Sequence, residues 1–211
     1  MTKRYFFVVA AIAAAAGIAG MYLARILTQP AAVQLESGTA LPQPAPLAAF
    51  SLVDTQGATI TPAELRGRPT LVFFGFTYCP DVCPTTLALL TSTQKQLAPE
   101  YEKLGGLRVA LITVDPERDT PGQLGKYISS FGGDLIGLTG NPPEIVKAQK
   151  SFGVASSRVD LAGGGYTMDH SATVFVLDAQ ARRVAVFTPP LRSEALMRDL
   201  RKLAPALGPA S

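Results

Sequence analysis

Two largely apolar segments constrain the fold of this chain most strongly. Residues 70–76 (TLVFFGF) and 107–114 (LRVALITV) lack the polar alternation of a half-exposed strand. Each is therefore predicted to be a strand that is buried on both faces of a sheet. Between them, residues 84–97 carry leucines at helical spacing. A strand, a helix and a second strand in this order predict a parallel pair, which is the basic unit of an α/β fold.

The rest of the chain extends this unit. A turn signal at residues 54–57 predicts a small hairpin, and Thr61 with Pro62 and Glu64 has the composition of a helix start. In sheets of the α/β class, ligand chemistry lies beyond the carboxyl ends of the parallel strands, which here means residues 77–83 and 115–121. The order of all elements predicts a thioredoxin-like sheet that opens with the hairpin 49–53/59–60, followed after the first unit by helix 121–131, strand 135–138, helix 142–152, hairpin 172–177/184–187 and helix 193–203.

The N-terminus carries an apolar segment that is separate from this domain. Lys3 and Arg4 precede an uncharged stretch at residues 5–24, and twenty helical residues span about 30 Å, the thickness of a hydrocarbon core. The two cations favour an N-terminus held inside the cell. We expect residues 1–27 to form a single transmembrane anchor or an uncleaved signal, while a cleaved signal peptide is the alternative. Each alternative places the rest of the chain on the outer face of a membrane.

Composition divides the remaining chain and excludes some functions. Residues 28–46 contain four prolines and several alanines with only Glu36 charged, so they are predicted to be a semi-extended linker. Residues 47–205 are predicted to be the thioredoxin-like domain, and residues 206–211 a short tail. The 19 basic and 16 acidic residues form no run of five like charges, which argues against a nucleic-acid partner. The sequence contains no Walker-type phosphate loop, which argues against nucleotide chemistry.

Both cysteines lie in one short motif directly after the first buried strand. In the sequence TYCPDVCP at residues 77–84, Pro84 fits only the first turn of a helix, so Cys79 lies in the loop and Cys83 near the helix start. Free backbone N–H groups at that position favour the thiolate form. The spacing suits one soft cation held by two sulfurs, or a disulfide. A purely structural disulfide is the alternative, but a loop of about five residues gains little stability from one.

His170 is the only histidine in the chain. It follows a glycine-rich stretch at residues 163–165 and precedes the predicted strand 172–177. In a thioredoxin-like topology this loop lies opposite the dithiol loop, and the glycines allow it to move. We therefore expect His170 to join Cys79 and Cys83 as a third metal ligand. Two thiolates and one imidazole select Cu(I) foremost, with Zn(II) as a competitor, and exclude Mg²⁺ and Ca²⁺.

Other side chains near these motifs have ordinary structural explanations. Asp115 ends a buried strand, where it serves turn and capping chemistry or supplies a carboxylate beside the site. Asp81 is expected to be an exposed charge, and Met168 is expected to pack on the sheet rather than bind metal. Tyr78 and Phe76 are expected to form an apolar rim or ordinary core. None of these five is predicted to be a metal ligand.

Three motifs together resemble one known family. CPDVCP at 79–84, VDPERDTP at 114–121 and DHS at 169–171 are similar to those of the Sco/SenC family, copper-binding proteins of cytochrome c oxidase assembly. The resemblance covers residues 47–203. It implies copper, Cu(I) and also Cu(II), bound by Cys79, Cys83 and His170. It also implies delivery to the dinuclear copper site of oxidase subunit II, an upstream periplasmic copper donor, and a single-pass protein of a bacterial-type inner membrane with its domain on the periplasmic side.

Three functional hypotheses fit these residues to different degrees. A copper metallochaperone, which is not an enzyme, needs both cysteines and His170. A thiol–disulfide oxidoreductase that reduces the cysteines of the recipient site needs Cys79 and Cys83 but tolerates the loss of His170. A peroxidase on the same fold needs donors for the peroxide oxygens, and the sequence offers no obvious arginine at the cysteine loop. The metallochaperone is the favoured hypothesis.

Overall fold

The computed structural model of this chain describes residues 2–27 and 33–208, which belong to two separate compact units. The first unit contains helix α1 (Thr2–Leu27). Its segment Tyr5–Tyr22 has a mean hydropathy of 1.9, and none of it is buried within the protein. By length and composition α1 is long and apolar enough to cross a membrane, a criterion that an N-terminal signal sequence also meets.

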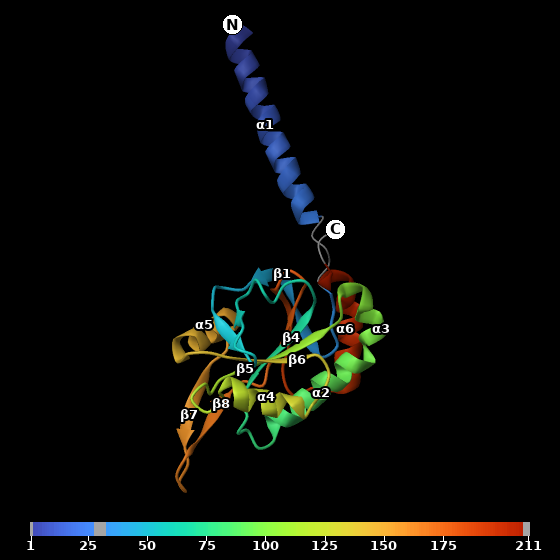
Figure 1. The fold of residues 1–211 in the computed structure, drawn as a ribbon. Helices are drawn as coiled ribbons and strands as arrows, with labels where there is room; N and C mark the ends of the chain where they lie inside the picture. The colour runs from blue at the N-terminus through green and yellow to red at the C-terminus, as the bar shows by residue number, and fades with distance from the viewer. Residues whose placement is uncertain (1, 28–32, 209–211) are drawn as a thin grey trace. The chain divides into compact units, whose positions relative to one another are not determined.

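The second unit is built on an eight-stranded mixed sheet (Figure 1). Its strand order is β1-β10-β9-β4-β5-β6-β2-β3, and β4, β5 and β6 run parallel at its centre. All other neighbouring pairs in this sheet are antiparallel. The strands are β1 (Gly38–Pro46), β2 (Leu52–Asp54), β3 (Thr59–Ile60), β4 (Thr70–Gly75), β5 (Arg108–Thr113), β6 (Leu135–Thr139), β9 (Val174–Leu177) and β10 (Arg182–Phe187).

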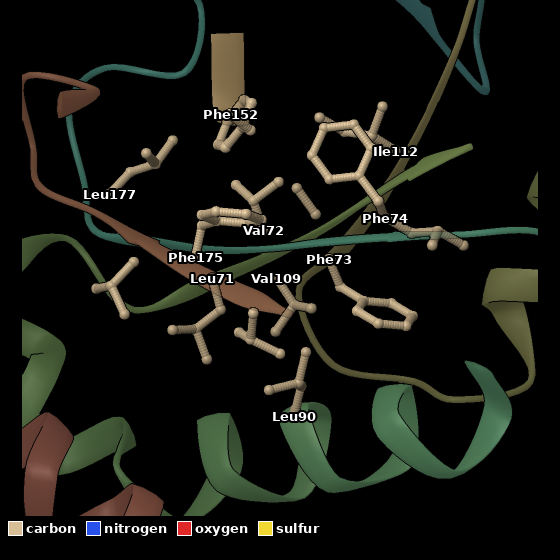
Figure 2. Close-up of a cluster of buried hydrophobic side chains, with 14 of the residues drawn as sticks. Leu71, Val72, Phe73, Phe74, Leu90, Val109, Ile112, Phe152, Phe175 and Leu177 are labelled. Carbon is tan, nitrogen blue, oxygen red and sulfur yellow. The ribbon is translucent and has the colours of Figure 1, made fainter. Parts of the chain in front are cut away.

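Helices cover both faces of this sheet. The hydrophobic layer below the sheet in Figure 2 contains Leu71, Val109 and Leu90 of α2, while the layer above it contains Val72 and Phe152 of α5. Adjacent residues of β4 point to opposite faces because side chains alternate along a strand. The helices are α2 (Val82–Gln96), α3 (Ala98–Tyr101), a 3₁₀ turn (Glu102–Leu104), α4 (Pro121–Ser129), α5 (Pro142–Phe152) and α6 (Ser193–Leu207).

The centre of this fold agrees with the sequence prediction. Both continuous apolar segments form fully buried strands, β4 and β5, which pair in parallel register from Thr70–Arg108 to Gly75–Thr113. The predicted small hairpin is β2–β3, and the predicted second hairpin is β9–β10. The thioredoxin-like α/β architecture is therefore confirmed, with the cysteine motif at the carboxyl end of β4.

The predicted linker is wrong for its second half. Residues 38–46 form β1, which pairs with β10 through Gly38–Phe187 and Pro46–Arg182. Of the predicted linker, residues 33–37 remain outside the sheet, while residues 28–32 lie outside the described part of the chain. Prolines are compatible with β1 because it is an edge strand, so the N–H group that proline lacks is not required on its open side.

Three further expectations need correction. The helix predicted at Thr61 is only a turn, although the N–H and the hydroxyl of Thr61 both donate hydrogen bonds to the Glu64 carboxylate there. Helix α6 continues through Pro205 to Leu207. The Leu207 side chain is buried, and its carbonyl oxygen accepts a hydrogen bond from the N–H of Ala179, so both hold this last turn. The predicted tail 206–211 therefore begins inside a helix. In addition, the stretch predicted as a glycine-rich loop forms a two-stranded hairpin, β7 (Ser156–Asp160) with β8 (Tyr166–His170), which extends away from the sheet (Figure 1).

Candidate metal centre

The two cysteines lie where β4 passes into α2. Cys83 is fully buried in the first turn of α2, and Cys79 is half-buried in the preceding loop. Both are free thiols. The backbone N–H of Cys83 donates to the sulfur of Cys79 at 3.4 Å. This bond uses one of the N–H groups that a helix leaves unpaired at its start, since Asp81 at the N-cap provides no side-chain bond there.

His170 is the last residue of β8, at the end of the β7–β8 hairpin that lies away from its turn, and its side chain lies beside the cysteines. Its Nε2 lies 3.6 Å from the Cys83 sulfur, and its Nδ1 lies 3.0 Å from the carbonyl oxygen of Ser171. Because a carbonyl oxygen only accepts, a neutral imidazole in this position carries its proton on Nδ1 and directs the lone pair of Nε2 toward the sulfur. Phe73 and Phe76 contact the imidazole edge-on, with centroids 6.1 and 5.8 Å away. Such an oriented imidazole resembles those of metal-binding histidines.

The buried position of Cys83 changes one expectation about its charge. Burial raises the pKa of the Cys83 thiol, and the neighbouring Cys79 raises it further, while a backbone contact with Phe76 acts in the opposite sense. The N–H groups of the helix start do not overcome this burial. Cys83 is consequently a protonated thiol at neutral pH in the metal-free protein, and metal binding there releases its proton.

These three side chains converge without forming a finished site. Among the described residues, no group of three His, Cys, Asp or Glu side chains is set to hold a metal ion as it stands. The donor set of two sulfurs and one imidazole nitrogen fits a soft, low-coordinate cation such as Cu(I). Completing a three-ligand site therefore requires a small movement, and His170 stands at the end of a hairpin that projects from the sheet (Figure 1).

The buried carboxylate of Asp119 holds the cysteine loop in place. No pattern in the sequence predicts this role for Asp119. Its fully buried carboxylate accepts bonds from the N–H and hydroxyl of Thr77, at 3.0 and 2.6 Å, and from the hydroxyl of Thr113 at 2.6 Å. Burial raises the pKa of Asp119, and these bonds oppose the increase. Thr120, the following residue, caps helix α4. The carboxylate thus ties the loop that carries Cys79 to the end of β5.

The other residues weighed from the sequence have distinct positions. Asp81 is exposed as predicted, and Met168 is half-buried against the core as predicted. Tyr78 is 56% exposed and Phe76 is buried, so of these two rings Tyr78 is the one that presents an apolar surface beside the centre. Asp115 is 3% exposed and accepts from Arg118 and Tyr166 rather than capping a helix.

Arg118 corrects the expectation that no arginine lies at the cysteine loop. Its guanidinium carbon is 4.7 Å from the ring centroid of Tyr78, which precedes Cys79. Arg118 is placed there by tertiary packing, since it lies 40 residues further along the chain than Tyr78. Its bond to buried Asp115 aims the guanidinium at this ring. The sequence signal that could have found it is its position directly after a buried strand on the expected ligand face.

Gly75 allows Cys83 to pack against the end of β4. A Cβ added at Gly75 would lie 2.9 Å from the Phe73 ring, 3.0 Å from the Cys83 sulfur and 3.3 Å from Leu111. We expect Gly75→Ala to lower the free energy of unfolding by about 1–3 kcal/mol, because the added methyl group overpacks the core. Urea unfolding measures this, with Gly122→Ala as the control. Nothing lies within 4 Å of a Cβ at Gly122 in α4, so that variant should be slightly stabilised, and equal effects would contradict the prediction.

Sequence comparison places this chain in a family. A model described as SCO1/SenC matches residues 39–205 of the chain. The chain belongs to the SCO1/SenC family. Among its relatives, the SCO2-like protein of Rickettsia conorii is 36% identical over 154 residues, which cover 72% of this chain and 74% of that protein. The resemblance inferred from the three motifs is thus confirmed.

Solved SCO1/SenC structures share the fold. ScoI from Bradyrhizobium japonicum, determined with copper bound, is 39% identical with a TM-score of 0.66, over 75% of this chain and 99% of that chain. ScoI from Arabidopsis thaliana, also determined with copper bound, is 32% identical with a TM-score of 0.70, over 75% of this chain and 97% of that chain. Both likenesses support the thioredoxin-like architecture described above.

Proposed function

We propose that this SCO1/SenC protein is a copper metallochaperone that binds Cu(I), and also Cu(II), through Cys79, Cys83 and His170. The observation that carries the proposal is the convergence of the only histidine and both cysteines of the chain at the carboxyl end of β4. The copper-bound ScoI structures of two relatives support copper as the cargo. Thiolate and imidazole donors favour Cu(I) over hard cations for the same reason.

The exposure of the two sulfurs suggests an order for metal transfer. Cys79 is half-buried and Cys83 is fully buried, so an incoming ion meets Cys79 first. Binding to Cys83 follows with release of its proton, and His170 then completes the site from the hairpin. Because each ligand is exchanged singly, the ion passes between proteins without being free in solution. Nothing turns over in this scheme, so the protein is not an enzyme in this role.

The family indicates the setting of this transfer. SCO1/SenC relatives are copper-binding proteins in cytochrome c oxidase assembly. We propose that the recipient is the dinuclear copper site of oxidase subunit II and that a periplasmic donor supplies the ion. Helix α1 would hold the protein in a bacterial inner membrane with the second unit on the periplasmic side, as its length and apolar composition allow.

A second function is supported by the contact between the two cysteines. Both are free, and the N–H of Cys83 reaches the Cys79 sulfur at 3.4 Å, so the pair is close enough to form a disulfide after modest movement. In this reaction, the Cys79 thiolate attacks a disulfide of the recipient site. Cys83 then gives up its proton and attacks the Cys79 sulfur of the mixed disulfide, which expels the recipient's bound cysteine. The products are a Cys79–Cys83 disulfide and two thiols on the recipient. Two electrons pass to the recipient, and such reduction would precede copper delivery.

Replacing His170 separates the two functions. We expect His170→Ala to weaken Cu(I) binding by about 100-fold, because one of three ligands is lost. The rate of disulfide exchange should stay within about twofold, because the imidazole is not one of the reacting groups. An anaerobic Cu(I) titration against a chromophoric chelator measures the first quantity. The rate at which the protein reduces an oxidised copper domain of oxidase subunit II measures disulfide exchange. Transfer of bound copper to the reduced domain then measures delivery.

The control for this experiment is Ser171→Ala, which changes the residue beside His170 but keeps the backbone carbonyl that orients the imidazole. It should bind and deliver copper as the wild-type protein does. Copper affinity that is unchanged in His170→Ala would overturn the three-ligand assignment. Delivery that fails while reduction proceeds would make the dithiol reductase the function of the protein.

A further inference from the structure

Arg118 lies between the cysteine loop and the hairpin that carries His170. Its Nε donates to buried Asp115 at 2.5 Å, which fixes the base of the side chain to the end of β5. Its guanidinium carbon lies 4.7 Å from the ring centroid of Tyr78 and 5.9 Å from that of Phe76. Both rings belong to the segment that leads into Cys79. Arg118 therefore contacts the cysteine loop through the faces of two aromatic rings.

The same guanidinium also contacts the hairpin. Its Nη1 donates to the carbonyl oxygen of Tyr166 at 2.9 Å, and its carbon lies 3.7 Å from the Tyr166 ring centroid. The Tyr166 hydroxyl in turn donates to Asp115 at 2.9 Å. Tyr166 begins β8, and His170 ends the same strand. Two hydrogen bonds and one stacked ring thus fasten the strand that bears His170 to Asp115 and Arg118, which follow β5.

The partners of Arg118 make this contact stronger than an ordinary surface pair. Asp115 is 3% exposed and Arg118 has 22% of its side chain exposed, so solvent screens their attraction little. The Arg118 Nη2 is buried without a hydrogen-bond partner. Cation–π attraction to the faces of Tyr78 and Tyr166 therefore offsets part of the cost of burying this group. A lysine cannot replace these interactions, because it lacks the planar fork that bonds Asp115 and Tyr166 together.

We propose that Arg118 is a positioning residue that holds the β7–β8 hairpin against the cysteine loop and so sets the distance of His170 from the two sulfurs. The inference rests on the proposed function for its effect on copper, and on the contacts alone for its effect on the hairpin. His170 approaches the Cys83 sulfur to 3.6 Å, while the Arg118 guanidinium bonds Asp115 after β5 and Tyr166 of β8 and stacks on the cysteine loop. None of these side-chain partners is one of the three ligands, so Arg118 acts on them through this arrangement.

A double-mutant cycle tests the proposal on copper. We expect Arg118→Lys to weaken Cu(I) binding by about tenfold, in the range seen when partners behind a metal ligand are removed. In the His170→Ala background the same change should alter affinity by less than about twofold, because the residue acts through His170. An equal tenfold loss in both backgrounds would overturn the proposal. We choose Arg118→Lys over Arg118→Ala because lysine keeps the charge at this position, so the test does not depend on whether the alanine variant folds.

Hydrogen exchange of the metal-free full chain tests the hairpin independently of copper. Amides of β8 should exchange about tenfold faster in Arg118→Lys, while amides of β4 and β5 should not change. Arg158→Ala is the matched control, since Arg158 stacks 3.7 Å from the same Tyr166 ring but makes only exposed ion pairs with Glu117 and Asp160. Unchanged β8 exchange in Arg118→Lys would overturn the proposal. Copper binding that ignores His170 would instead overturn the proposed function, and the exchange result would still decide the hairpin.

Discussion

Replacing Cys83 by serine should abolish stoichiometric Cu(I) binding. Structural four-ligand zinc sites bind with about 10–16 kcal/mol, or about 3 kcal/mol per ligand, and each 1.4 kcal/mol is a factor of ten. By this analogy the loss of one thiolate weakens binding by about 100- to 1,000-fold. Cys83 is the residue whose loss matters most, because it contacts both Cys79 and His170. A serine hydroxyl is a hard, weakly acidic donor and does not replace the sulfur.

The anaerobic chelator titration that measures His170→Ala also measures this variant. Met168→Leu is the matched control, since it removes the other sulfur close to His170 along the chain while keeping a similar apolar volume. Its copper affinity should equal that of the wild-type protein. One equivalent of Cu(I) held by Cys83→Ser with wild-type affinity would disprove the ligand assignment. A large loss in Met168→Leu would instead add a fourth ligand.

The parts of the fold that could be predicted are those whose signal is local. Strands β4 and β5 are buried on both faces, so their apolar character appears in the sequence without any partner being known. For strand β1 the sequence predicts a linker, because several of its residues are prolines and, with none of them fully buried, it lacks a continuous apolar run. Its place in the sheet depends on β10, which lies about 140 residues further along the chain. No local pattern of residues reports such a pairing.

The same distinction applies to the candidate site. Cys79, Cys83 and His170 could be selected because these residue types are rare in the chain and carry specific chemistry. Arg118 and Asp119 could not be assigned a role in this way. Charged residues after a strand are ordinary. Apart from the hydroxyl of Thr113, the rings and hydroxyls that they contact lie 40 to 48 residues away in sequence, as in the 42-residue separation of Thr77 from Asp119 and the 48-residue separation of Arg118 from Tyr166. The sequence specifies the ligands, while tertiary packing specifies what positions them.

Asp199 in α6 holds the segment that leads into β1. Its fully buried carboxylate accepts bonds from the backbone N–H groups of Glu36, Ser37 and Gly38, at 2.7, 2.7 and 3.2 Å, and from the Ser37 hydroxyl at 3.0 Å. Arg198 adds two bonds to the carboxylate of Glu36. This arrangement, rather than hydrophobic burial, is what makes residues 36–38 part of the domain.

We expect Asp199→Asn to lower the free energy of unfolding at pH 7 by about 3 kcal/mol, because charged acceptors of buried N–H groups are lost. Burial alone would raise the pKa of Asp199, but the bonds from Glu36, Ser37 and Gly38 hold it below its usual value. A carboxylate with a lowered folded-state pKa stabilises the protein fully above about pH 4, its unfolded value, and loses that stabilisation as the pH falls through the folded pKa. The difference between the wild-type protein and Asp199→Asn should therefore shrink below pH 4.

This difference is measured by urea unfolding of the full chain in detergent between pH 3 and pH 7, with circular dichroism as the probe of unfolding. Lys202→Ala is the control, because Lys202 is half-exposed and lies 3.7 Å from the same carboxylate, so its removal should cost less than about 1 kcal/mol. A difference that persists unchanged at pH 3 would show that the Asp199 charge is not what holds the segment. Amide exchange in β1 should rise in Asp199→Asn and not in Lys202→Ala, since detachment of residues 36–38 frees this edge strand first.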